Sequence, residues 1–83
     1  MLMLSEGLNV FRTALNEKMT GRALLDLSIR EQTGCSVMAV KRSGELIVNP
    51  DPAIVLEKGD ELLLIGPAEA EKAFMEMYPP EKI

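Results

Sequence analysis

The densest group of side chains that could bind a metal ion is acidic: Glu57, Asp60 and Glu61 lie within five residues. Carboxylate oxygens are the ligands that hard cations such as Ca²⁺ and Mg²⁺ prefer. The spacing does not match an EF-hand loop, however, and the run 57–60, Glu-Lys-Gly-Asp, is typical of a solvated turn between two strands. We therefore expect a turn and no metal site, with a bound cation as the weaker alternative.

The residue types that nucleophilic enzymes use are scarce. The chain has no histidine, which removes Ser-His-Asp and Cys-His systems and histidine-ligated zinc. Its one cysteine, Cys35, allows no intrachain disulfide or cysteine cluster. Cys35 follows a predicted helix, whose negative dipole end disfavours a thiolate, so a small strand residue is favoured over a reactive thiol. Because glycine-rich phosphate loops are also absent, we predict no catalytic residue and no enzyme.

Arg30 is the basic residue with the clearest potential role. It lies in the last turn of a predicted helix, just before Thr33-Gly34. A guanidinium near a strand edge can bind a phosphate through two parallel hydrogen bonds. The alternative, which the residues alone favour, is a cation that offsets the helix dipole and pairs with Asp26 four residues earlier.

Length and charge restrict the class of protein. Eighty-three residues make one domain, or a fragment of a larger chain, with a modest core that could gain from a partner. The net charge is −4: residues 1–50 carry six basic and five acidic side chains, and residues 51–83 carry three and eight. With three aromatic residues and no basic stripe, we expect no nucleic-acid partner. No apolar run approaches the roughly 20 residues of a membrane span, so we expect a soluble, intracellular protein.

Apolar alternation and turn residues predict four strands and the turns between them. The predicted strands are residues 8–15, 35–42, 45–48 and 61–65. Ser43-Gly44 is a two-residue hairpin connection that sets Arg42 opposite Glu45, a favourable cross-strand pair. The two prolines of residues 49–52 end the third strand, and a short extended piece at 53–56 precedes the acidic turn.

Two segments carry helix signals. Thr20 is the predicted N-cap of the first helix and Gly34 its predicted C-cap. The second helix begins at Gly66-Pro67 and ends at Tyr78-Pro79-Pro80. Its apolar residues repeat with the spacing of one buried helix face, at Ala70, Ala73, Phe74 and Met77. The order β-α-β-β-β-α with a mainly antiparallel sheet predicts an α+β fold, a sandwich of two layers.

An ordered set of short motifs runs from residue 20 to residue 66. The motifs are Gly21-Arg-Ala-Leu-Leu-Asp-Leu-Ser-Ile-Arg30, Thr33-Gly34, Val37-Met-Ala-Val-Lys-Arg42, Gly44-Glu45, Ile47-Val-Asn-Pro50, Leu56-Glu-Lys-Gly-Asp60 and Leu62-Leu-Leu-Ile-Gly66. In this order they cover more than half of the chain, which resembles the RCK C-terminal domain family (regulator of potassium conductance, TrkA-C type). The resemblance implies that residues 8–80 are an RCK C-terminal-like domain, residues 1–7 a linker or N-terminal extension, and residues 81–83 a tail.

The same resemblance implies a function. Domains of this family are homodimeric and cytoplasmic, and they regulate channels, transporters or antiporters of potassium or other cations. They normally follow a Rossmann-like RCK N-terminal domain. That domain and a membrane-embedded channel or transporter, on the same or a separate chain, are therefore the implied partners. The alternative is a purely structural homodimerisation module with no small-molecule ligand.

Some relatives bind cyclic di-AMP or another small ligand in the cleft between two such domains. Carried over by position, Arg30 faces a phosphate, and Ser36, Val37, Asn49 and Pro50 line a pocket for the base. Nucleotide-binding relatives often have Asn where this chain has Ser36, and a hydroxyl cannot form the paired hydrogen bonds that an amide makes with an adenine edge. No cofactor is fixed by the residues; the resemblance implies cyclic di-AMP or another small effector.

Overall fold

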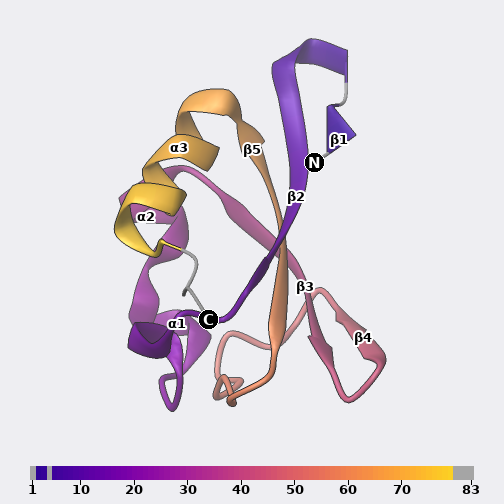
Figure 1. Ribbon diagram of the computed structural model, residues 1–83, viewed down its shortest axis with the longest axis vertical. Helices are drawn as coiled ribbons and strands as arrows, with labels where there is room; N and C mark the ends of the chain where they lie inside the picture. Colours follow the sequence, from indigo (N-terminus) through magenta and orange to yellow (C-terminus); the bar gives the residue numbers. More distant parts are fainter. Residues whose placement is uncertain (1, 4, 80–83) are drawn as a thin grey trace.

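The computed structural model describes residues 2–3 and 5–79, which form an antiparallel sheet with helices packed on one face (Figure 1). The strand order is β1-β2-β5-β3-β4, with β1 at Leu2–Met3, β2 at Leu8–Ala14, β3 at Ser36–Arg42, β4 at Glu45–Val48 and β5 at Glu61–Pro67. The helices are α1 (Leu24–Leu27), α2 (Ile29–Thr33) and α3 (Ala68–Met77). The predicted α+β sandwich of two layers is confirmed.

The central strands bury alternate residues against the helices. Leu62 and Leu64 of β5 are fully buried, and they stand opposite Val40 of β3 and Phe11 of β2 in the sheet register. Residues directly opposite one another point to the same face, so these four side chains form the sheet side of the core. Phe74 of α3 completes it, with its ring centroid 5.9 Å from that of Phe11 in an edge-on arrangement.

The hairpin between β3 and β4 forms as predicted. Ser43 and Gly44 both have positive φ, 51° and 80°, as a two-residue turn that matches the twist of the strands requires. Arg42 and Glu45 are cross-strand partners, as expected. Their side chains do not pair, because the Arg42 guanidinium reaches Asp60 instead.

The first helix differs from the prediction. The segment expected to be one helix forms α1 and α2, separated by Ser28 in the left-handed conformation at φ 48°. Leu27 and Ile29 flank this break, and both are buried. Two residues two positions apart lie on opposite sides of a continuous helix, so the break lets both enter one core. The predicted C-cap at Gly34 is confirmed, since it has φ 87° and its N–H donates to the Arg30 carbonyl at 2.9 Å.

The start of α1 is held by a distant loop and not by a capping side chain. The N–H groups of Leu24 and Leu25 donate to the carbonyls of Ile54 (2.9 Å) and Pro52 (2.8 Å). Thr20 was the expected N-cap, but it ends a 3₁₀ turn at Glu17–Met19. The prediction failed because these donors are satisfied by tertiary contacts, which local sequence does not show.

The last strand and helix lie close to the predicted positions. β5 continues through Gly66 and Pro67, which pair with Asn9 and Leu8 of β2, so the predicted strand break at these two residues is wrong. Pro67 is also the N-cap residue of α3, so its missing N–H falls where the strand pairing ends and the helix begins. In α3, Ala70 and Phe74 are buried and Ala73 and Met77 are half-buried, as the apolar spacing predicted. Tyr78 ends the helix, while Pro80 lies outside the described residues.

The segment expected to be a linker contributes to the sheet. Leu2–Met3 pair antiparallel with β2, opposite Val10 and Asn9, and a 3₁₀ turn at Ser5–Gly7 connects the two strands. Residues 81–83, the expected tail, lie outside the described residues.

Candidate functional site

A cleft of about 320 Å³ lies between the two short helices, the start of β3 and the loop that follows β4. It is lined by Leu24, Leu25, Ser28, Ile29, Arg30, Glu31, Cys35, Ser36, Val37, Pro50 and Pro52. Four of the five residues that the resemblance implied for a ligand site therefore lie on one cleft: Arg30, Ser36, Val37 and Pro50. These residues come from three segments of the chain, which only the fold brings together.

The fifth residue, Asn49, is placed differently. It is exposed, has φ 51°, and donates its N–H to the Met38 carbonyl at 2.8 Å. Asn49 therefore turns the chain from β4 towards Pro50 and is absent from the residues that line the cleft. Asparagine is among the residues that adopt this backbone conformation most readily.

Arg30 is exposed at the cleft on α2. Within the part of the chain that the structure describes, its guanidinium makes no hydrogen bond or ion pair, and the expected pair with Asp26 is not formed. The backbone carbonyl of Asp26 accepts instead from Arg22, at 3.1 Å. The five donors of the Arg30 side chain are thus available to an anion such as a phosphate.

Cys35 lies directly before β3 and is one of the residues that line the cleft. Cys35 is fully buried, and burial raises the pKa of its thiol above the ordinary value. Its N–H donates to the Thr33 hydroxyl (3.1 Å), which itself donates to the Ile29 carbonyl (2.7 Å). The thiol is therefore neutral near pH 7, as expected for a packing residue and not for a nucleophile.

Seven lining residues were not predicted for the site: Leu24, Leu25, Ser28, Ile29, Glu31, Cys35 and Pro52. Leu25 is 65% exposed. Pro52 had a signal in the sequence, because two prolines so close together cannot continue strand pairing and so mark a loop that leaves the sheet. The leucines gave no such signal. The lining thus combines apolar side chains with one cation, Arg30, and one carboxylate, Glu31. The apolar surface beside the Arg30 guanidinium suits an anionic ligand with ring systems.

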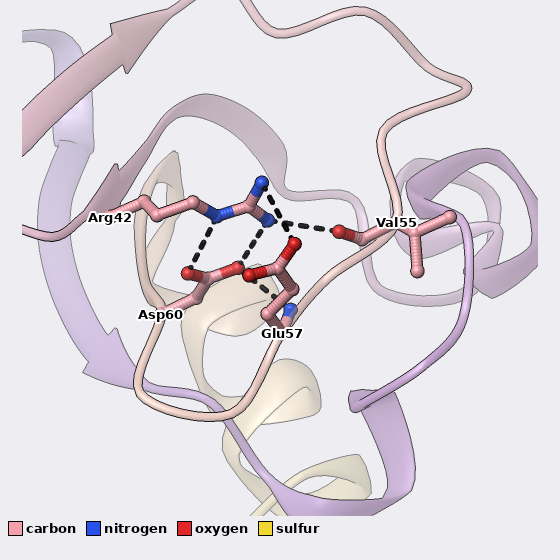
Figure 2. A network of polar contacts seen from close by, with 4 residues as sticks. All are labelled: Arg42, Val55, Glu57 and Asp60. Atoms are coloured by element: carbon pink, nitrogen blue, oxygen red, sulfur yellow. Dashed lines mark hydrogen bonds and ion pairs between the residues drawn. The ribbon is translucent and has the colours of Figure 1, made fainter.

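The acidic turn makes a structural contact with the end of β3. Figure 2 shows the Asp60 carboxylate facing the Arg42 guanidinium, which donates to it through Nε (3.0 Å) and Nη2 (2.7 Å). These hydrogen bonds hold the pKa of Asp60 below its ordinary value. Arg42 also donates to the Val55 carbonyl at 2.9 Å and lies 3.4 Å from a Glu57 oxygen. Among the described residues, no group of three or more potential ligands could hold a metal ion.

Comparison with known families identifies the family of this chain. Residues 10–78 match the TrkA-C domain. The chain belongs to the TrkA-C domain family. This result confirms the resemblance seen in the short motifs. The match extends from within β2 to the end of α3 and includes every residue that lines the cleft.

The TrkA-C domain has relatives in potassium transport. Ktr system potassium uptake protein C of Bacillus subtilis (strain 168) is 38% identical over 65 residues, which are 78% of this chain and 29% of that protein. The RCK C domain of the potassium transport protein KtrA, solved with cyclic di-AMP, has a TM-score of 0.81 at 36% identity over 88% of this chain and 86% of that one. The GsuK channel bound to NAD has a TM-score of 0.80 at 36% identity, over 87% of this chain and 14% of that one.

This chain spans about three-tenths of the length of the curated relatives that it matches. A more distant neighbour is BusR of S. agalactiae, solved with its busAB-promoter DNA, at 24% identity and a TM-score of 0.70; this likeness is one of fold. Over residues 2–3 and 5–79, the TrkA-C domain has no helix with the length and apolar character to cross a membrane.

Proposed function

We propose that this TrkA-C domain is a cytoplasmic regulatory module of a potassium or other cation channel, transporter or antiporter, and that it homodimerises and senses a small effector. One observation carries the proposal: Arg30, Ser36, Val37 and Pro50, drawn from three segments, line a single cleft. The proposed effector is cyclic di-AMP or a similar anionic nucleotide. The proposed partners of the domain are the membrane-embedded transport protein and a Rossmann-like RCK N-terminal domain. The domain itself has no catalytic role in this proposal.

The volume of the cleft supports a ligand shared by two subunits. About 320 Å³ is near the lower end of the volumes that enclose a drug-sized ligand, so a cyclic dinucleotide needs a second cleft to cover it. In this arrangement each Arg30 binds one phosphate, and the prolines and leucines contact the bases. A ligand held in this way favours the relative orientation of the subunits that it binds best, and the attached transport protein responds to that orientation.

The second candidate function is a structural dimerisation module without a ligand. Leu25 favours it, because an apolar side chain that is 65% exposed at the rim of a cleft gains stability when a second subunit covers it. In this case the neighbouring subunit fills the cleft with side chains, and Arg30 pairs with an acidic residue of that subunit.

Thermal denaturation of the purified 83-residue chain with cyclic di-AMP separates the two candidates. A ligand at about 100 times its dissociation constant stabilises by roughly 2.7 kcal/mol, which raises the melting temperature of a domain of this size by roughly 10–20 °C. The sensing function predicts such a rise, with one cyclic di-AMP bound per dimer by calorimetry. Cyclic di-GMP, ATP and NADH serve as competing nucleotides.

Two variants complete the experiment. Arg30→Ala should abolish the rise in melting temperature and leave the dimer intact by light scattering. Arg12→Ala is the matched control, since Arg12 is an exposed arginine outside the cleft whose ion pair with Glu61 is 3.6 Å long. A dimer without a response to cyclic di-AMP favours the structural module, and a monomer at high micromolar concentration contradicts both candidates.

A further inference from the structure

The loop of residues 49–60, here called the connecting loop, joins β4 to β5 and supplies the cleft with Pro50 and Pro52. The loop is attached to β3 at both ends. At its start, the Asn49 N–H donates to the Met38 carbonyl at 2.8 Å. At its end, the Asp60 carboxylate accepts two hydrogen bonds from the Arg42 guanidinium.

Between these two attachments the connecting loop runs beside residues 21–25. The Leu56 N–H donates to the Arg22 carbonyl (2.9 Å), and Ala23 and Val55 form an isolated antiparallel bridge. The bonds from Leu24 and Leu25 to the carbonyls of Ile54 and Pro52 continue the same pairing. Residues 21–25 supply Leu24 and Leu25 to the cleft, and the connecting loop supplies Pro50 and Pro52.

Arg42 touches the pairing directly. Its Nη2 donates to the Val55 carbonyl at 2.9 Å, and the same nitrogen donates to Asp60, as Figure 2 shows. We infer that Arg42 is a positioning residue for the cleft: it fixes the connecting loop against residues 21–25 and so sets the place of Pro50 and Pro52. As far as ligand affinity is concerned, this inference rests on the proposed function.

The chemistry of the contact requires arginine. Two parallel N–H groups match the two oxygens of a carboxylate, and the fork of the guanidinium leaves a further donor direction for the Val55 carbonyl. Asp60 has a side chain that is 2% exposed, and it also accepts from the Glu57 N–H at 2.8 Å, so its position is fixed. A lysine ammonium carries the same charge but cannot make this set of bonds in one geometry.

The test uses Arg42→Lys in the 83-residue chain, with Arg12→Lys as the matched control. Arg12 is a second arginine that pairs with an acid, Glu61 of β5, and among the described residues it forms no hydrogen bond or ion pair with the connecting loop. Amide hydrogen exchange is measured at 25 °C, followed by calorimetric titration with cyclic di-AMP. In Arg42→Lys the amides of Leu24 and Leu25 should gain at least about tenfold more in exchange rate than the amides of the β2–β5 ladder, whose rates report the change in global stability. The affinity for cyclic di-AMP should fall roughly tenfold.

Asp60→Asn breaks the same contact from the other side and keeps the volume of the side chain, so it provides a second measurement. Unchanged exchange at Leu24 and Leu25 in both variants overturns the inference. Equal acceleration at every amide also overturns it, because it reports global destabilisation alone. If the unmodified chain does not bind cyclic di-AMP, the proposed function fails, and the exchange rates still decide whether Arg42 positions the cleft.

Discussion

Arg42 at the end of β3 and Asp60 before β5, 18 residues apart in the chain, form a two-pronged hydrogen-bonded ion pair with distances of 3.0 and 2.7 Å. The cross-strand neighbour of Arg42 is Glu45, which the hairpin places opposite it. Arg42 pairs with Asp60 because that carboxylate is buried and already oriented by the Glu57 N–H, whereas Glu45 is exposed to water. The pair ties the sheet to the loop that forms one wall of the cleft.

The Asp60 carboxylate should make the free energy of unfolding of the domain depend on pH. Since its pKa is lowered in the folded chain, its contribution is complete above the ordinary carboxylate pKa of about 4 and is lost as the pH falls through the lowered value. The charged groups that face it are Arg42 and Glu57. Asp60→Asn should lower the free energy of unfolding at pH 7 by about 1–3 kcal/mol, and urea titrations should show this difference shrinking at low pH. Asp26→Asn, at an exposed carboxylate, is the control; a difference independent of pH would contradict the argument.

Phe74 should be the most sensitive position of α3. Its side chain is fully buried between Phe11 and Tyr78, with ring centroids 5.9 and 5.4 Å away. Phe74→Ala removes this ring and leaves a cavity, which typically destabilises a protein by about 3–5 kcal/mol. Val48→Ala, at a side chain that is 68% exposed, should change stability by less than about 0.5 kcal/mol. Equal midpoints in urea for the two variants would refute this placement of the core.

Gly66 should not tolerate a side chain. A Cβ at this position would lie 3.1 Å from the Ala70 Cβ and 3.2 Å from the Cys35 Sγ, so β5 and α3 would have to move apart. Gly66→Ala should destabilise the domain by about 1–3 kcal/mol through overpacking. In a Cys35→Ala background the loss should be smaller, because one crowding atom is gone. Thermal denaturation of the four chains completes the cycle, and an equal loss in both backgrounds would show that the crowding lies elsewhere.

Ser36 should limit the affinity for an adenine nucleotide. It is exposed at the first position of β3 on the cleft, and its hydroxyl cannot reproduce the paired hydrogen bonds of an amide. If cyclic di-AMP binds as proposed, Ser36→Asn should tighten binding about tenfold in calorimetric titration. Ser43→Asn is the matched control in the hairpin turn, where φ 51° suits asparagine. An affinity that stays unchanged at Ser36, or changes equally at both serines, would argue against contact between this position and the base.

The sequence by itself determined the elements whose signals are local. The apolar spacing of Ala70 and Phe74 defined the buried face of α3, Ser43-Gly44 defined the hairpin, and Gly34 defined the end of a helix. Each depends on residues within one or two turns of chain, where propensity and backbone geometry dominate. The ordered motifs also identified the family, because their order along the chain is itself sequence information.

Tertiary structure decided the features that depend on distant partners. The first helix breaks at Ser28 because two flanking side chains enter one core, and its start is held by carbonyls of Pro52 and Ile54, almost thirty residues later. The sequence likewise did not identify the ion-pair partner of Arg42, because the choice between Glu45 and Asp60 depends on which carboxylate the fold buries. The cleft results from these same long-range hydrogen bonds, which exist only after the connecting loop has packed against α1.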